Sequence, residues 1–132
     1  MKLARGFLIF NGLIFGSYGI QCLLDPAVVS ELTGMQLSTN TAIIEVRAMY
    51  GGLQLTMGLY LLYCAMQIVR VSQGLLVAIF IFAGMAGARS FGLAIDGGDS
   101  GYNIAATAYE SICGVIAVFL LQKSHQTTTA GT

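Results

Sequence analysis

The sequence contains little charge. Only 9% of its 132 residues are charged, whereas 56% are hydrophobic and the mean hydropathy is +0.79. This balance is typical of membrane proteins and lies outside the range of ordinary soluble domains. Six basic residues are matched by six acidic ones, and no basic run occurs. The chain lacks the electrostatic footprint of a nucleic-acid-binding protein, so nucleic acid is excluded as a partner.

Cysteine and histidine are also scarce. Cys22, Cys64 and Cys113 lie in apolar stretches without CxxC spacing, and their odd number argues against a disulfide framework. The single histidine, His125, lies in a polar tail, so the sequence predicts no metal site. It also has no phosphate-binding loop, nucleotide fingerprint or nucleophile elbow. These absences favour a protein that is not an enzyme, with quinone or lipid left open as a bound molecule.

Four long apolar segments dominate the sequence. A helix needs about 20 apolar residues to cross a hydrocarbon core of about 30 Å. We therefore expect an all-α fold, an integral membrane four-helix bundle over residues 1–122, followed by a polar tail over residues 123–132. The expected helices cover about residues 3–24, 41–66, 73–95 and 102–121. Between the first two, Asp25, Pro26 and Gly34 predict a short helix on the membrane surface.

The basic residues predict the orientation. Lys2, Arg5, Arg70 and Lys123 would all lie on one side of a four-helix bundle, and the other two loops carry no lysine or arginine. Positive residues favour the cytoplasmic side of a membrane. We therefore expect a multi-pass protein with both termini in the cytoplasm.

Small residues predict where the helices pack closely. Gly12 and Gly16 form a GxxxG pair on the first helix, and Gly51 lies in a Gly-Gly pair on the second. Gly84, Ala88 and Gly92 repeat every four residues on the third. Such patterns let membrane helices approach each other, usually within one chain. They also leave a homo-oligomer open.

Four charged residues fall inside the apolar segments. These are Glu45 and Arg47 on the second, Arg89 on the third and Glu110 on the fourth. A charge at the bilayer centre costs at least about 2.5 to 3.5 kcal/mol on insertion scales. Two acids and two bases at similar depth therefore predict a compensated network with a buried salt bridge.

Helical spacing gathers further polar residues around this network. Arg47, Tyr50 and Gln54 share a face of the second helix, as do Asn103 and Glu110 on the fourth. The predicted ligand or partner pocket comprises Glu45, Arg47, Tyr50, Gln54, Arg89, Asp96, Asn103 and Glu110. The alternative is a set of internal salt bridges that fixes helix register. Buried ion pairs are often no more stabilising than apolar replacements. The retention of four charges in the membrane therefore favours a ligand or partner pocket over a purely structural role.

The loop of residues 96–101 has two interpretations. Its sequence, Asp-Gly-Gly-Asp-Ser-Gly, offers two carboxylates that could bind a cation. A glycine-rich turn between antiparallel helices explains it equally well.

The charged positions also carry a resemblance. The runs Glu45-Val-Arg47-Ala-Met-Tyr50-Gly51-Gly52 and Gly87-Ala-Arg89-Ser-Phe-Gly92, followed by Tyr102-Asn103 and Glu110, resemble a bacterial four-helix membrane family of unknown function related to the DoxX-like group. The resemblance implies the bacterial inner membrane. DoxX-like relatives include a subunit of a thiosulfate:quinone oxidoreductase and an assembly chaperone for receptor channels.

The leading hypothesis is a non-catalytic membrane protein. Its charged outer-leaflet pocket would bind a lipophilic ligand with a polar head, such as membrane lipid, or a membrane-protein partner in an accessory or assembly role. One alternative is a quinone-docking subunit of a membrane oxidoreductase. Another is a purely structural charge network without a ligand.

Overall fold

The computed structural model describes residues 1–97 and 100–129, and within these residues it contains helices and no strands. The prediction of an all-α fold is confirmed for this part of the chain. The elements in chain order are α1 (Lys2–Leu24), α2 (Ala27–Thr33), α3 (Asn40–Val46), the π-helical segment η1 (Arg47–Leu53), α4 (Gln54–Met66), the 3-10 turn η2 (Ile68–Arg70), α5 (Val71–Asp96) and α6 (Gly101–Thr129).

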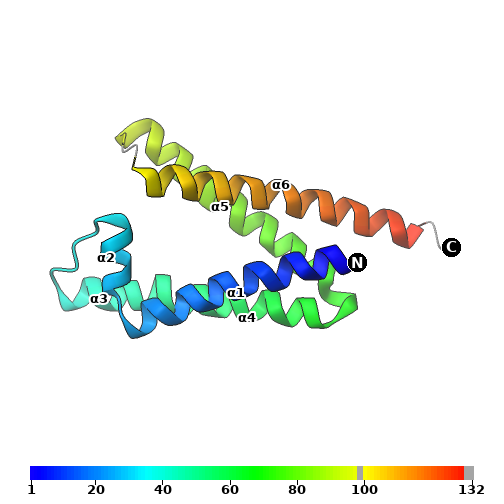
Figure 1. Ribbon diagram of the computed structural model, residues 1–132, viewed down its shortest axis with the longest axis horizontal. Helices are drawn as coiled ribbons and strands as arrows, with labels where there is room; N and C mark the ends of the chain where they lie inside the picture. Colours follow the sequence, from blue (N-terminus) through cyan, green and yellow to red (C-terminus); the bar gives the residue numbers. More distant parts are fainter. Residues whose placement is uncertain (98–99, 130–132) are drawn as a thin grey trace.

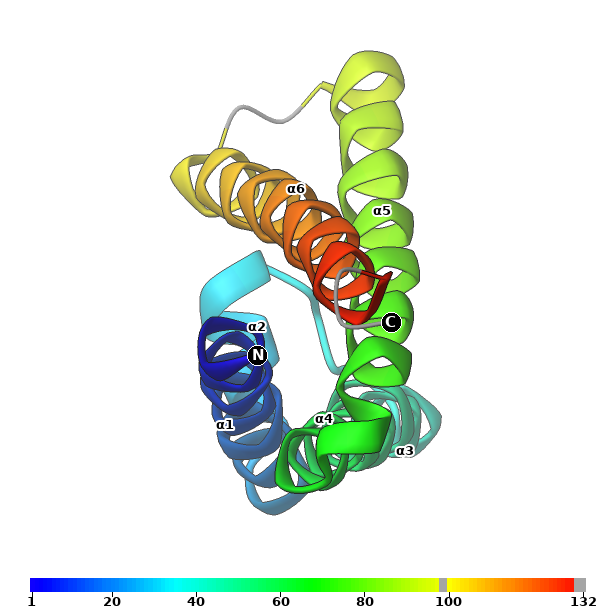
Figure 2. The same cartoon turned by 90° about the vertical axis from the view of Figure 1, so that its right-hand side faces the viewer.

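The long helices form two closely packed pairs. Helix α1 lies along α4 and η1, and α5 lies along α6 (Figure 1). Figure 2 gives the same arrangement end-on, with α1 and α4 on one side and α5 inclined to both of them. The contact between the two pairs is less extensive than the contact within each pair. This arrangement leaves room for a cavity between α4 and α5.

Glycines allow α1 to approach its partner helix closely. A Cβ atom added to Gly58 would lie 2.5 Å from the Gly16 nitrogen, and one added to Gly19 would lie 2.5 Å from the Leu55 nitrogen. A Cβ atom on Gly12 or Gly51 would meet the Leu62 or Leu23 side chain at 2.8 or 2.7 Å. The backbones are therefore in direct contact, as small residues permit in membrane helices.

Phe82 of α5 joins the two pairs. Its fully buried ring lies with its centroid 5.6 Å from that of Phe15 and 6.4 Å from that of Phe7, both on α1, and 5.9 Å from that of Tyr109 on α6. Aromatic pairs at these separations pack favourably. The three cysteines are buried and unpaired, as the sequence predicts.

The connection after α1 contains the expected short helix. The Asp25 Oδ1 atom accepts a hydrogen bond from the Ala27 amide at 3.0 Å, and Gly34 ends α2 with φ of +75°. Val29 anchors the helix, because its buried side chain packs with Cys22 of α1 and Val46 of α3. Helix α2 therefore packs against the end of α1 and against α3.

Three helices of the described residues are long and apolar enough to cross a membrane. They cover Lys2–Leu24, Ile68–Asp96 and Gly101–Ser124. The sequence predicts a further span over residues 41–66. In the structure, the segment over residues 40–66 is helical throughout but divided among α3, η1 and α4. Its π-helical part separates two α-helices that are individually too short to span.

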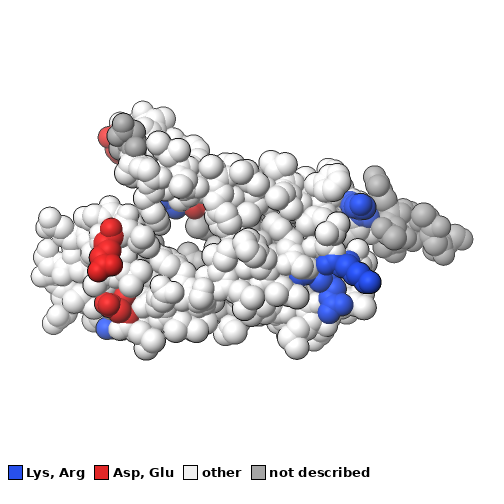
Figure 3. Space-filling view, in the orientation of Figure 1, with Lys and Arg blue, Asp and Glu red and all other residues white. Residues whose placement is uncertain are grey.

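The charges are separated along the molecule. Lys2 and Arg5 begin α1, Arg70 lies between α4 and α5, and Lys123 lies near the end of α6. Figure 3 shows most of the visible lysine and arginine at the end of the molecule where the N-terminus lies. Aspartate and glutamate are prominent at the opposite end, where some blue is also visible. The basic groups are anchored locally: the Arg5 Nε atom donates to the Ala65 carbonyl at 2.8 Å, and the Arg70 guanidinium lies 5.2 Å from the Tyr63 ring centroid.

Candidate functional site

A salt bridge connects the C-terminal half of α5 to α6. The Arg89 Nη2 atom lies 2.8 Å from Glu110 Oε1, and Arg89 Nε lies 3.2 Å from Glu110 Oε2. Glu110 is 2% exposed and the Arg89 side chain is 24% exposed. The prediction of a buried salt bridge is confirmed. Both carboxylate oxygens are engaged, which gives the strong bidentate form of this contact.

Two residues of the first turn of α6 complete the surroundings of Arg89. Its Nη1 atom donates to Asn103 Oδ1 at 3.4 Å, and its guanidinium carbon lies 5.7 Å from the Tyr102 ring centroid. Residues 103 and 110 are seven apart, so they share a face of the helix. The arginine is therefore held by a carboxylate, an amide and an aromatic ring.

A cavity of about 700 Å³ opens beside Arg89, with η1 and α4 on one side and α5 on the other. Tyr50 and Gln54 contribute polar groups on one side, and Arg89 does so on the other. The remaining lining residues are apolar or glycine: Met49, Leu53, Met57, Ile81, Gly84, Met85 and Ala88. An apolar cavity with a few convergent polar groups is the usual form of a small-molecule site.

The π-helical segment η1 shapes one wall of this cavity. It supplies Met49, Tyr50 and Leu53 to the lining, while Gly51 of the same segment packs against Leu23 of α1. A π-helix is wider than an α-helix and is frequent at functional sites. Here it allows one short segment to pack against α1 and also present Tyr50 to the cavity.

A second, smaller hollow of about 240 Å³ lies on another side of Arg89. Asp96 and Asn103 line it together with Gly92, Leu93 and Gly97. Asp96 is exposed at the end of α5. Gly98 and Asp99, which the cation interpretation of this loop requires, lie outside the described residues. Within the described residues, no group of three His, Cys, Asp or Glu side chains is arranged to hold a metal ion.

Arg47 and Glu45 lie apart from the Arg89 and Glu110 pair. The Arg47 Nη1 atom donates to the carbonyl of Leu23, in the last turn of α1. A cation at a helix C-terminus satisfies an unpaired carbonyl and interacts favourably with the helix dipole. Glu45 is exposed on α3. The structure thus brings together Tyr50, Gln54, Arg89, Asp96, Asn103 and Glu110, and places these two residues elsewhere.

The small residues of α5 border open space. Gly84 has no heavy atom within 4 Å of an added Cβ atom, and Gly84 and Ala88 line the larger cavity. Gly92 lines the smaller hollow. By contrast, Gly12, Gly16 and Gly51 lie in the close contact of α1 with α4 and η1.

Sequence reasoning missed one buried polar pair. The Tyr109 hydroxyl donates to Asn11 Oδ1 at 2.6 Å, and the Asn11 amide donates to the Phe7 carbonyl at 2.9 Å. Asn11 is fully buried in the middle of α1. An asparagine in the middle of an apolar membrane helix is the signal that could have identified it. The pair ties α1 to α6 one residue before Glu110.

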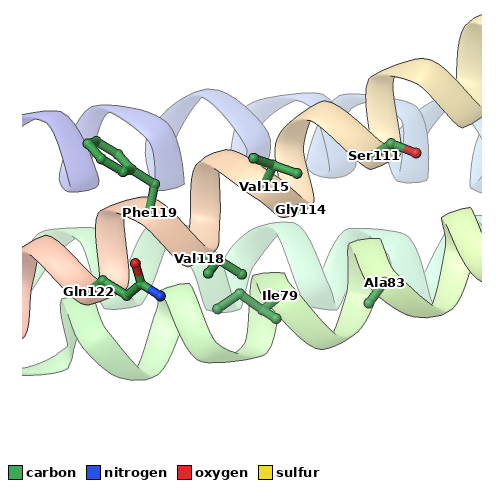
Figure 4. Close-up of a pocket in the computed structure, with 8 residues that line it drawn as sticks. All are labelled: Ile79, Ala83, Ser111, Gly114, Val115, Val118, Phe119 and Gln122. Atoms are coloured by element: carbon green, nitrogen blue, oxygen red, sulfur yellow. The ribbon is translucent and has the colours of Figure 1, made fainter.

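A third hollow lies between α5 and α6 and carries no charged side chain. It measures about 470 Å³, and Figure 4 shows Val118 of α6 facing Ile79 of α5 within it. Ser111 and Gln122 of α6 supply its polar atoms. The rest of its lining is apolar or glycine, whereas the cavity beside Arg89 also contains a charged side chain.

Comparison with known proteins identifies the family. The family model described as "Domain of unknown function (DUF4345)" matches residues 3–121, and the chain belongs to this family. Neither the curated proteins nor the solved structures contain a match to the chain.

Proposed function

We propose that this member of the DUF4345 family is a non-catalytic membrane protein that binds a lipophilic molecule with a polar head in the cavity beside Arg89. The observation that carries the proposal is the composition of that cavity. Its lining combines apolar side chains with Arg89, Tyr50 and Gln54. A lipophilic body would contact the apolar lining, and the polar head would lie against these three residues.

The position of the cavity also supports this function. It lies between the two helix pairs, where the contact is less extensive than the contact within each pair. A molecule dissolved in the membrane could enter from the side without crossing water. A quinone-docking role is the alternative, since a quinone has a lipophilic body with polar oxygens.

We further propose that residues 40–66 form a fourth membrane crossing. At 1.5 Å per residue they would extend about 40 Å, which exceeds the hydrocarbon core of about 30 Å. The π-helical segment would be tolerated within the membrane because it borders a cavity and packs against α1. The result is a multi-pass protein of the bacterial inner membrane, in keeping with the resemblance to DoxX-like proteins, with α2 on the outer surface.

The orientation follows from the basic residues. Lys2 and Lys123 line one hollow at the start of α1, Arg5 donates to the Ala65 carbonyl near the end of α4, and Arg70 follows α4 in η2, so the four lie at one end of the molecule. Lysine and arginine favour the cytoplasm. We expect green fluorescent protein fused after Thr132 to fluoresce in bacteria, and alkaline phosphatase fused there to be inactive. Active phosphatase at this position would contradict the orientation.

Filling the cavity is expected to abolish binding. Gly84→Leu adds a side chain into the cavity wall without meeting protein atoms close to the backbone. We expect native mass spectrometry of protein gently extracted from its own membrane to detect a bound small molecule, and at least about tenfold less of it in the variant, because the new side chain occupies its space.

Gly87→Leu is the matched control. It lies on the same helix, an added Cβ atom also meets nothing within 4 Å, and Gly87 does not line the cavity. Both changes remove a helical glycine, so they alter helix propensity equally. Wild-type protein without a bound molecule, or equal occupancy in the two variants, would refute the proposed function.

A further inference from the structure

We propose that the head group bound beside Arg89 is uncharged and accepts hydrogen bonds through a carbonyl-type oxygen. The inference rests on the proposed function, because it names the class of ligand for the same cavity. It narrows the choice between an acidic and a neutral head, which the sequence leaves open.

The charge of Arg89 is already balanced. Glu110 binds the guanidinium through both carboxylate oxygens, at 2.8 and 3.2 Å. Every other residue that lines the cavity is uncharged. Arg47, the other arginine of the predicted pocket, donates to the Leu23 carbonyl and does not line the cavity. An anionic head would therefore introduce a negative charge that no side chain of the cavity neutralises, which is costly inside a membrane.

A cationic head is disfavoured as well. It would approach the Arg89 guanidinium, which carries the same charge. Glu110 could not serve as its partner, because this carboxylate is 2% exposed and engaged by Arg89. Separating the pair would leave a charge buried without compensation.

Hydrogen-bond donors remain for a neutral acceptor. An arginine has five N–H groups. Among the described residues, Glu110 accepts hydrogen bonds from two of the N–H groups of Arg89, and Asn103 accepts one. Tyr50 and Gln54 add a hydroxyl and an amide to the same cavity. Within the described part of the chain, neither group is engaged in a hydrogen bond. The site is therefore rich in donors but electrically neutral.

Carbonyl oxygens on an apolar body meet both conditions. They accept hydrogen bonds from arginine, tyrosine and glutamine, and they add no charge. Two membrane molecules share this chemistry: ester lipids without a charged head, and quinones. The cavity of about 700 Å³ would enclose such a head and the first part of the attached chain.

Three probes test the inference. Dioctanoylglycerol and dioctanoyl phosphatidate share their acyl chains and ester carbonyls, and they differ in the charge of the head. Decyl-ubiquinone represents the quinones. In native mass spectrometry from a neutral detergent, we expect a neutral probe to bind wild-type protein at least about tenfold more tightly than phosphatidate. Binding of the glycerol ester alone would identify an ester site, and binding of the quinone alone a quinone site.

Two variants assign the effect to named groups. Gln54→Leu keeps the ion pair and removes one neutral donor, so we expect the neutral probe to bind about three- to tenfold more weakly. Glu110→Gln leaves Arg89 with an uncompensated charge, so we expect it to shift the preference toward phosphatidate. Gln54→Leu provides the test if the Glu110 variant fails to fold.

The failures are distinguishable. If phosphatidate binds wild-type protein more tightly than either neutral probe, and Gly84→Leu abolishes that binding, the cavity is a ligand site and the inference about its head group is wrong. If none of the three probes binds, the inference and the proposed function both fail.

Discussion

Glu110→Gln is expected to lower the free energy of unfolding by about 3 kcal/mol, at the lower end of the range for breaking a buried ion pair. Glutamine keeps the shape of the side chain but removes its charge. The guanidinium of Arg89 would then remain between α5 and α6 without a counter-ion, since Asn103 and Tyr102 offer it only a neutral oxygen and an aromatic face. The partial exposure of the Arg89 side chain keeps the cost below the upper limit.

Removing both charges is expected to be far less harmful. In the double variant Arg89→Met, Glu110→Leu, two apolar side chains of similar length replace the pair. Apolar replacement of a buried ion pair is often neutral or stabilising. We therefore expect an unfolding free energy within about 1 kcal/mol of wild type, together with the loss of neutral-ligand binding. A stable double variant that no longer binds would separate the function of the pair from its contribution to the fold.

These values can be measured by titrating the protein with sodium dodecyl sulfate in mixed micelles and following circular dichroism. Glu45→Gln is the control, because Glu45 is an exposed acid on α3, and its effect should stay within about 0.5 kcal/mol. A double variant as unstable as Glu110→Gln would indicate that the pair is purely architectural. A Glu110→Gln protein as stable as wild type would indicate that Arg89 is compensated in another way.

The Arg89 and Glu110 contact was predictable because insertion cost acts on each charge independently of the rest of the fold. Any folded arrangement must compensate both residues, and their depths in the predicted helices are similar. The role of Arg47 was not predictable in the same way. Its long side chain can reach either the end of α1 or the bundle interior. Which of the two it contacts depends on how far α1 is shifted along η1 and α4.

The cavity depends on features that periodicity does not encode. The spacing of Tyr50 and Gln54 places both on one face of an ideal α-helix, and both line the cavity. The spacing does not reveal that Tyr50 lies in the π-helical segment η1, whereas Gln54 begins α4. Gly84, Ala88 and Gly92 form a ladder of small residues that predicts a close helix contact. In the structure two of them line a cavity, because small residues permit either a neighbouring backbone or open space.

One of the tightest helix contacts involves a glycine outside the predicted packing set. Gly58 lies opposite Gly12 and Gly16, and an added Cβ atom there would lie 2.6 Å from the Gly12 carbonyl oxygen. A sequence signal existed: Gly12 and Gly19 are seven residues apart, as are Gly51 and Gly58. Seven residues are two turns of a helix, so each pair shares one face.

Gly58→Ala is therefore expected to destabilise the protein by about 2 to 3 kcal/mol, despite the better helix propensity of alanine. The added methyl group would collide with the backbone atoms of α1, which cannot rotate away as a side chain can. The two helices would have to separate along the interface that also positions η1 beside the cavity. The same detergent titration measures the loss of stability. We expect native mass spectrometry to show weaker ligand binding by the same variant.

Gly16→Ala provides the comparison across the same interface. An added Cβ atom at Gly16 meets nothing within 4 Å, so this variant should retain wild-type stability or gain up to about 1 kcal/mol from helix propensity. The two variants introduce the same methyl group into facing helices, and only the backbone contact differs. Equal unfolding free energies for both would mean that α1 and α4 are further apart than this contact requires, and that the cavity wall formed by η1 is not fixed by α1.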